Sequence, residues 1–174
     1  MKIMHISGHK KIMGNFNSKE SYYFSRIANI WGWATWRNRW ELYDIRMENL
    51  ELNRKVVMDN FKMPKHGKYW YRLFKHIRDS GIDTWDAQWQ YTVSINNGAC
   101  ITPFVNLIEN TGFDSEATHT ITKDKSLNTK TGNINSIVHP FKIEINDKLD
   151  IQEMNQRIPS LFKKILKKLK KYGK

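Results

Sequence analysis

The amino-acid sequence predicts an α/β fold, because short apolar runs typical of strands alternate with longer stretches that carry apolar residues at helical spacing. With 174 residues, 40% of them hydrophobic, the chain can bury one core. The clearest helix covers residues 68–80, where Trp70, Leu73, Phe74 and Ile77 follow an i, i+3, i+4, i+7 pattern. The strand-like runs cover residues 1–8, 22–24, 99–101, 105–108 and 137–145.

A tryptophan-rich segment begins at Trp31 and contains the first residues of chemical interest. Trp33, Trp36 and Trp40 are spaced i, i+3, i+7, which predicts one helical face packed into the core. Before this helix, Gly32 permits close approach of a ligand to the backbone, and free N–H groups at a helix start attract phosphate. We therefore interpret Trp31, Gly32 and Trp33 as candidate residues of an acceptor or diphosphate pocket.

Turn and cap residues predict the helix boundaries on either side of the amphipathic helix. Residues 48–61 are predicted to form one solvated helix, and Pro64 and Gly67 indicate a break before the next one. Asp83 is expected to cap a later helix that ends at residues 96–98 (Asn-Asn-Gly), since asparagine and glycine tolerate the left-handed conformation.

Asp86 is the candidate catalytic residue. It stands near the start of the expected helix, next to Trp85 and three residues before Trp89. A carboxylate in a site lined by aromatic rings can take the proton from an attacking hydroxyl group as a general base. The alternative is a capping box, in which the Asp86 side chain accepts a bond from the N–H of Asp83. The sequence leaves both interpretations open.

Three motifs in a fixed order resemble those of a known family. They are WGWATWRNRWELYD at residues 31–44, IDTWDAQW at residues 82–89 and NTGFDSEATHT at residues 110–120. Together they resemble bacterial nucleotide-diphospho-sugar transferases, often described as hemolysin-like glycosyltransferases. Their order is similar to that in the acceptor half of the Golgi N-acetylglucosaminyltransferase that begins complex N-glycans. The resemblance covers roughly residues 3–120 and implies the acceptor-side half of an incomplete GT-A-like fold.

The resemblance also implies roles for individual residues. Asp86 matches the base of an inverting glycosyltransferase, although Ala87 and Gln88 replace the second acid of the related WDDW segment. His119 matches a histidine that helps to hold a divalent metal, Mn²⁺ or Mg²⁺, at the diphosphate of the donor. The implied substrate-binding residues are Trp31, Gly32, Trp33, Trp85, Gly112 and Phe113.

The donor side of this family has no counterpart in the sequence. A GT-A enzyme begins with nucleotide-binding βαβ units and an acidic metal-binding motif, and no Asp-x-Asp pair occurs upstream of Ser7. We therefore expect binding of the nucleotide-sugar donor and its metal to need residues supplied from outside this chain, which puts autonomous activity in doubt.

The net charge of +12 is concentrated toward the C-terminal end, since residues 157–174 hold eight Lys and Arg and no acid. Residues 158–174 are predicted to form a basic amphipathic helix that binds the surface of an anionic membrane. A helix docked on the domain is the alternative. Nucleic-acid binding is disfavoured, because aromatic residues do not interleave with the basic run.

These observations divide the chain into an acceptor-side half (residues 1–120), a variable segment (121–157) and a basic helix (158–174). The expected function is transfer of a sugar from a nucleotide-diphospho-sugar to a glycan or glycolipid acceptor in surface polysaccharide synthesis. Two alternatives stay open. One is a non-catalytic remnant or carbohydrate-binding, membrane-associated module, and the other is a basic membrane or nucleic-acid binding protein.

Two further expectations concern location and the thiol. The sequence has no signal-peptide apolar region and no run of apolar residues long enough to span a bilayer. We therefore expect a cytoplasmic protein that is peripheral to the inner face of the membrane. Cys100 is the single cysteine and lies in an apolar run, so we expect a buried, inert thiol.

Overall fold

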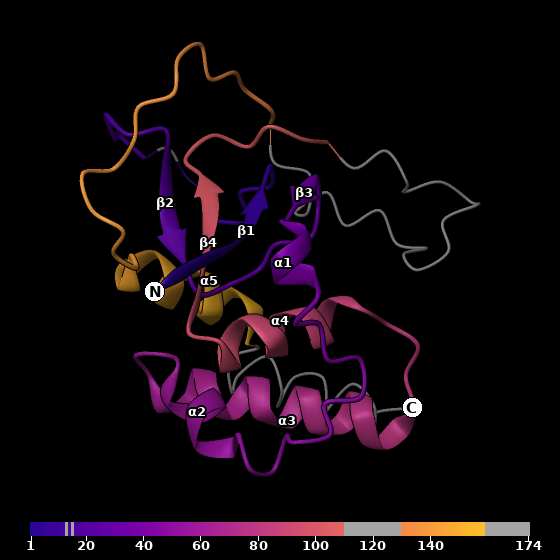
Figure 1. Cartoon of the computed structure of the whole chain (residues 1–174). Coiled ribbons are helices and arrows are strands. Elements are labelled where there is room, and N and C mark those ends of the chain that lie inside the picture. Colours follow the sequence, from indigo (N-terminus) through magenta and orange to yellow (C-terminus); the bar gives the residue numbers. More distant parts are fainter. Residues whose placement is uncertain (13, 15, 110–129, 159–174) are drawn as a thin grey trace, which may run out of the picture.

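The computed structural model describes residues 1–12, 14, 16–109 and 130–158 and shows a mixed α/β arrangement. Its strands are β1 (Lys2–Ser7), β2 (Tyr22–Ser25), β3 (Trp33–Ala34) and β4 (Gly98–Pro103). Its helices are α1 (Arg37–Trp40), α2 (Arg54–Asp59), α3 (Pro64–Ser80), α4 (Asp86–Ile95) and α5 (Asp147–Arg157). The sheet occupies one end of the molecule, α2 and α3 occupy the other, and α4 lies between them (Figure 1).

The four strands form one sheet in the order β2-β4-β1-β3. The two central strands, β1 and β4, are parallel, and each edge strand is antiparallel to its neighbour. Because parallel neighbours need a crossover connection, the chain between β1 and β4 travels through α1, α2, α3 and α4. The predicted strands at residues 1–8 and 22–24 are confirmed, and β1 is an internal strand.

Helix α4 is buried on two sides, which explains why its apolar residues do not form a single stripe. Trp89 and Val93 pack with Cys100 of β4, whereas Tyr91 packs with Phe74 of α3 in a second cluster. Every residue of α4 from 87 to 94 is buried. The predicted burial of Cys100 is confirmed. The predicted apolar face of α3 is also confirmed, since Trp70, Phe74 and Ile77 are buried.

The predicted helical face of Trp33, Trp36 and Trp40 is wrong. Trp33 belongs to β3, where it pairs with Ser7, so its backbone is extended. Only Arg37–Trp40 forms the short helix α1. Trp36 is 45% exposed and Trp40 is 39% exposed, so neither side chain is buried in the core.

The predicted break at Gly67 is also wrong, because Gly67 lies inside α3 and is buried there. Helix α3 begins at Pro64, the position where proline is best tolerated. Gly67 serves close packing, since a Cβ atom there would lie 2.0 Å from the carbonyl oxygen of Met58. The predicted solvated helix over 48–61 is reduced to Arg54–Asp59, and it buries Val57 completely.

Two predicted strands are absent from the described residues. After β4, Asn106 takes up backbone groups with its side chain: Oδ1 accepts from the N–H of Lys10, and Nδ2 donates to the carbonyl of Ile108. Residues 105–108 are therefore held by the Asn106 side chain and by single backbone bonds, such as that from the N–H of Leu107 to the carbonyl of Gly8, and not by a strand ladder. Residues 137–145 contribute one isolated bridge, between Ile145 and Phe24.

Helix α5 is an element that the sequence analysis placed in a variable segment. It begins where the Asn146 side chain accepts a hydrogen bond from the N–H of Leu149, and it packs against β2. Arg157 ends α5, so this residue belongs to the folded domain and not to a basic tail. The rest of the predicted basic helix, residues 159–174, lies outside the described residues.

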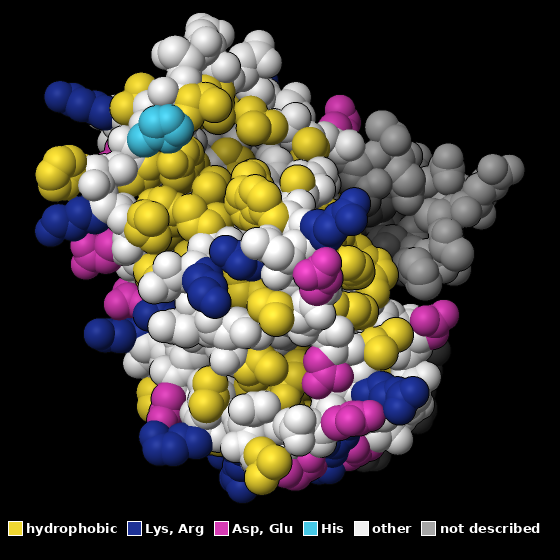
Figure 2. Space-filling model, viewed as in Figure 1, with side chains coloured by type: hydrophobic (Ala, Val, Ile, Leu, Met, Phe, Trp, Pro, Cys, Tyr) yellow, Lys and Arg dark blue, Asp and Glu magenta, His cyan; other side chains and the backbone are white. Residues whose placement is uncertain are grey.

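The surface in Figure 2 shows apolar side chains gathered at the sheet end of this face, with acidic and basic side chains interspersed around them and over the helical end. Charges of both signs therefore alternate on this face and do not form one basic stripe. In the part of the chain that the structure describes, no helix combines the length and apolar character needed to cross a bilayer.

Candidate functional site

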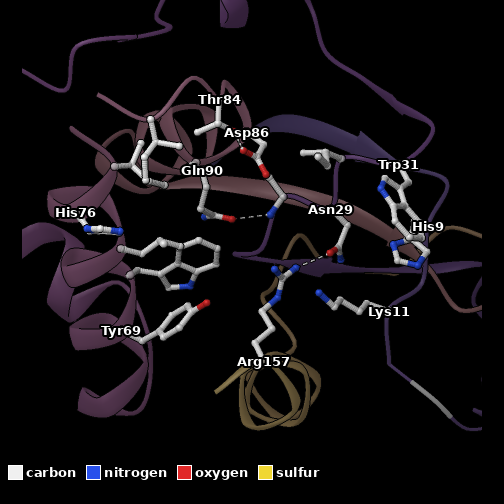
Figure 3. Close-up of a pocket in the computed structure, with 17 residues that line it drawn as sticks. His9, Lys11, Asn29, Trp31, Tyr69, His76, Thr84, Asp86, Gln90 and Arg157 are labelled. Carbon is white, nitrogen blue, oxygen red and sulfur yellow. Dashed lines mark hydrogen bonds between the residues drawn. The ribbon is translucent and has the colours of Figure 1, made fainter. Parts of the chain in front are cut away.

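A cavity of about 480 Å³ opens between the end of the sheet, α3, the start of α4 and the last turn of α5 (Figure 3). Its lining combines aromatic rings, amides, one carboxylate and two basic side chains, Lys11 and Arg157. The lining residues are His9, Lys11, Ala28, Asn29, Ile30, Trp31, Tyr69, Trp70, Leu73, His76, Ile77, Ile82, Thr84, Asp86, Ala87, Gln90 and Arg157. Two of the residues singled out in the sequence, Trp31 and Asp86, therefore share one cavity.

Asp86 is the first residue of α4 and supplies the only carboxylate among the lining residues. The Thr84 hydroxyl donates a hydrogen bond to Asp86 Oδ1. The predicted capping box with Asp83 is wrong, because Trp85 is the N-cap and its side chain makes no capping hydrogen bond. Within the described residues, Asp86 Oδ2 makes no hydrogen bond, so this oxygen can accept a proton from a ligand.

Arg157 reaches into the cavity from α5, on the side opposite Asp86 (Figure 3). Its Nη2 donates to Asn29 Oδ1 at 2.6 Å and to Glu153 Oε1 at 2.8 Å. Its guanidinium also lies 5.7 Å from the centre of the Trp70 ring, a cation–π distance. Glu153 is almost completely buried, so the ion pair fixes the arginine in one position.

Lys11 and His9 enter the cavity from the loop that follows β1. Burial lowers the pKa of the Lys11 ammonium to about 8, and the neighbouring charge of Arg157 adds to this effect. Burial lowers the pKa of His9 to about 4, so its imidazole is neutral at pH 7. The His9 ring lies against Trp31, with ring centres 4.6 Å apart. Lys11 and Arg157 are thus the charged donors on this side.

Gln90 connects α4 to the backbone on the far side of the cavity. Its Oε1 accepts from the N–H of Ala28 at 2.8 Å, and its Nε2 donates to the carbonyl of Arg26 at 2.9 Å. These bonds tie the segment that carries Asn29 to the helix that carries Asp86. The cavity is therefore held open by side-chain bonds to backbone groups and does not depend on loop conformation alone.

Aromatic faces complete the lining. Tyr69 and Trp70 of α3 both line the cavity. Trp31 stands across the cavity from Tyr69 (Figure 3). The buried Trp70 Nε1 has no hydrogen-bond partner among the described residues. Flat rings of this kind can pack against the apolar face of a pyranose while amides and charges bind its hydroxyl groups.

Three other residues singled out in the sequence lie outside this cavity. Trp33 and Trp85 stack on each other with ring centres 4.9 Å apart, in a separate aromatic cluster that includes Trp89. Gly32 has a φ of +55°, and a Cβ atom there would lie 2.7 Å from Ile108 Cγ2. The conformational freedom of Gly32 therefore serves a turn and close packing.

The remaining implied site residues, Gly112, Phe113 and His119, lie outside the described residues. Among the described residues, no group of three or more His, Cys, Asp or Glu side chains is placed to hold a metal ion. The described residues of the cavity therefore do not fit the divalent metal that the family resemblance implies.

The residues that the sequence analysis missed are His9, Lys11, Asn29 and Arg157. A local signal existed only for Arg157, which follows Glu153 by four residues in a segment that Asn146 caps. No protein-family model matches the chain, and no curated protein or solved structure matches it either.

Proposed function

We propose that this chain is the acceptor-side half of a nucleotide-diphospho-sugar transferase and that the cavity binds the sugar acceptor. One observation carries the proposal: Asp86, in the motif WDAQW, lines a cavity that also presents aromatic faces and amide groups. The size of about 480 Å³ suits a ligand of one or two sugar units.

In this proposal Asp86 acts as the general base. Its free Oδ2 accepts the proton of an acceptor hydroxyl while the hydroxyl oxygen attacks the anomeric carbon of the donor sugar. The bond from that carbon to the nucleotide diphosphate breaks, the diphosphate leaves with the electron pair, and the configuration inverts. Thr84 holds Oδ1 and so orients the carboxylate toward the cavity.

The donor in this proposal is a nucleotide-sugar. Its binding residues are not among the residues that the structure describes. We further propose that the reaction serves surface polysaccharide synthesis at the cytoplasmic face of the membrane, with residues 158–174 binding anionic lipid.

The test is a transfer assay with the protein isolated from its own source, a set of nucleotide-sugars, and detection of the product by mass. Asp86→Asn should lower the rate by about 10²–10⁴-fold, the usual contribution of a general base. Asp83→Asn is the matched control, because Asp83 is an exposed carboxylate three residues earlier that does not line the cavity. Equal transfer rates for Asp86→Asn and the parent protein would refute the assigned role.

A further inference from the structure

Lys11 is a cation in the cavity that no carboxylate contacts among the described residues; Glu153 attracts it from a distance, and the repulsion by Arg157 is the larger of the two effects. The Lys11 side chain is half-buried and makes no hydrogen bond or ion pair with the residues that the structure describes. The preceding residue differs, since the Lys10 ammonium donates to the carbonyl of Gly14 at 2.7 Å. Removing an ammonium group from water without a partner is costly, and a ligand that supplies a negative charge would offset that cost.

Arg157 adds unused donors beside Lys11. Its Nε and Nη2 are engaged by Glu153 and Asn29, whereas Nη1 has no hydrogen-bond partner among the described residues. Figure 3 shows the guanidinium and the Lys11 ammonium approaching the same part of the cavity. Glu153 forms an ion pair with Arg157 and only a longer-range attraction with Lys11, so two cations share one carboxylate and this side of the cavity keeps a net positive charge.

The charges and hydrogen bonds of the other lining residues determine how an anionic ligand is oriented in the cavity. His9, on the Lys11 side, is neutral at pH 7, and the amide of Asn29 is already bonded to Arg157. Asp86 lies across the cavity and would repel an anion placed next to it. A ligand with one anionic group therefore binds with that group at Lys11 and with a hydroxyl group toward Asp86.

We propose that Lys11 and Arg157 Nη1 form an anion subsite that selects an acceptor sugar bearing a carboxylate or a phosphate group. This inference rests on the proposed function and narrows the acceptor to sugar acids and sugar phosphates. The anionic group sets the orientation, so that the opposite hydroxyl of the sugar meets the carboxylate of Asp86.

The experiment measures dissociation constants by tryptophan fluorescence for five probes: glucuronate, glucose 1-phosphate, glucose, inorganic phosphate and UDP. One of the two acidic sugars should bind at least about tenfold more tightly than glucose, the effect of one charge-assisted hydrogen bond. Lys11→Gln should remove this preference. Lys148→Gln, which removes an exposed charge from α5, should keep it.

The outcomes separate the two proposals. Tighter binding of glucuronate or of glucose 1-phosphate identifies the carboxylate or the phosphate as the group bound. Equal binding of glucose and both acidic sugars overturns the anion subsite and leaves the acceptor cavity standing. Inorganic phosphate or UDP binding as tightly as glucose 1-phosphate overturns the assignment to an acceptor. Failure of all five probes to bind overturns both the subsite and the acceptor cavity.

The unfolding temperature of Lys11→Gln shows whether Lys11 binds the anion or only stabilises the fold. Because burial and the repulsion by Arg157 outweigh the attraction of Glu153 for Lys11, Lys11→Gln should unfold at the same temperature as the parent protein or higher. Lost anion preference together with a lowered unfolding temperature would count against the proposal, since a structural lysine would behave in that way.

Discussion

Replacing Gly67 with alanine tests whether α3 packs against the end of α2 as closely as the structure shows. A Cβ atom at position 67 would lie 2.0 Å from the carbonyl oxygen of Met58 and 2.6 Å from its Cα. Real Cβ atoms essentially never come closer than 3.0 Å to a heavy atom outside their own residue and its two chain neighbours. The two backbones therefore have to separate by about 1 Å, and no side-chain rotation can relieve the contact.

The expected loss of stability follows from two opposing effects. Overpacking against backbone atoms should cost about 3 kcal/mol, the upper end of the usual range. Alanine in a helix interior is favoured over glycine by about 1 kcal/mol, which offsets part of this cost. The net loss of about 2 kcal/mol should lower the unfolding temperature by about 4 to 8 °C for a chain of this length.

Thermal unfolding followed by circular dichroism measures this change. Gly81→Ala is the control: Gly81 ends α3 with a φ of +61°, and a Cβ atom there meets nothing within 4 Å. The control should cost about 1 kcal/mol from left-handed strain alone. If Gly67→Ala unfolds at the parent temperature or above it, α2 does not lie against α3 as described. Because α3 carries Tyr69 and Trp70 into the cavity, Gly67→Ala should also weaken binding of sugar probes.

Two further predictions concern buried charge. Burial lowers the pKa of His5 to about 4, so this residue alone should lower the free energy of unfolding by up to about 3 kcal/mol as the pH drops from 6.5 toward 4, and His9 adds to the loss. The raised pKa of Asp150, about 6, works in the opposite direction, and urea titrations of His5→Asn should show a shallower loss than the parent. Glu153→Gln leaves Arg157 without its buried counter-ion and should cost about 3 kcal/mol in the same assay. Lys55→Gln is the control: it breaks an exposed i, i+4 pair and should leave the urea midpoint of unfolding unchanged.

The elements that could be predicted from the sequence are those whose burial follows one local period. Helix α3 buries Trp70, Phe74 and Ile77, which stand three to four residues apart on one face. The same reasoning failed for the tryptophan-rich segment, because the extended backbone of Trp33 is set by pairing with Ser7, a residue 26 positions away. Helical spacing of three residues says nothing about such a distant partner.

Helix α5 escaped prediction for a different reason: half of its buried face is charged. Asp150 and Glu153 are buried beside Leu149 and Met154, so an apolar period is hard to detect. The partners of Asp150 lie far away in sequence, and Glu153 bonds both to the distant Asn29 and to Arg157, four residues on. Asp150 Oδ1, for example, accepts from the Ser25 hydroxyl at 2.6 Å. A pattern of apolar residues therefore could not show that this face is buried.

The candidate site could be predicted only in part, for the same reason. Asp86 and Trp31 stand in motifs that their own sequence neighbourhood makes conspicuous. Lys11 and Arg157 are ordinary basic residues in polar stretches, and they become a site only because the fold brings together residues 146 positions apart. The sequence indicates a carboxylate in an aromatic surrounding, whereas the anion-binding side depends on tertiary structure.

One backbone segment, residues 25–29, determines how the two sides of the cavity stand relative to each other. On one side, Asp150 accepts from the N–H of Arg26 at 3.0 Å and Asn29 accepts from Arg157, and these bonds fix the position of α5. On the other side, Gln90 bonds to the backbone of the same segment and seats α4, the helix that begins with Asp86. Both helices are therefore hydrogen-bonded to the same stretch of five residues. A displacement of this segment would move the carboxylate and the guanidinium together, which keeps their separation suited to a single ligand.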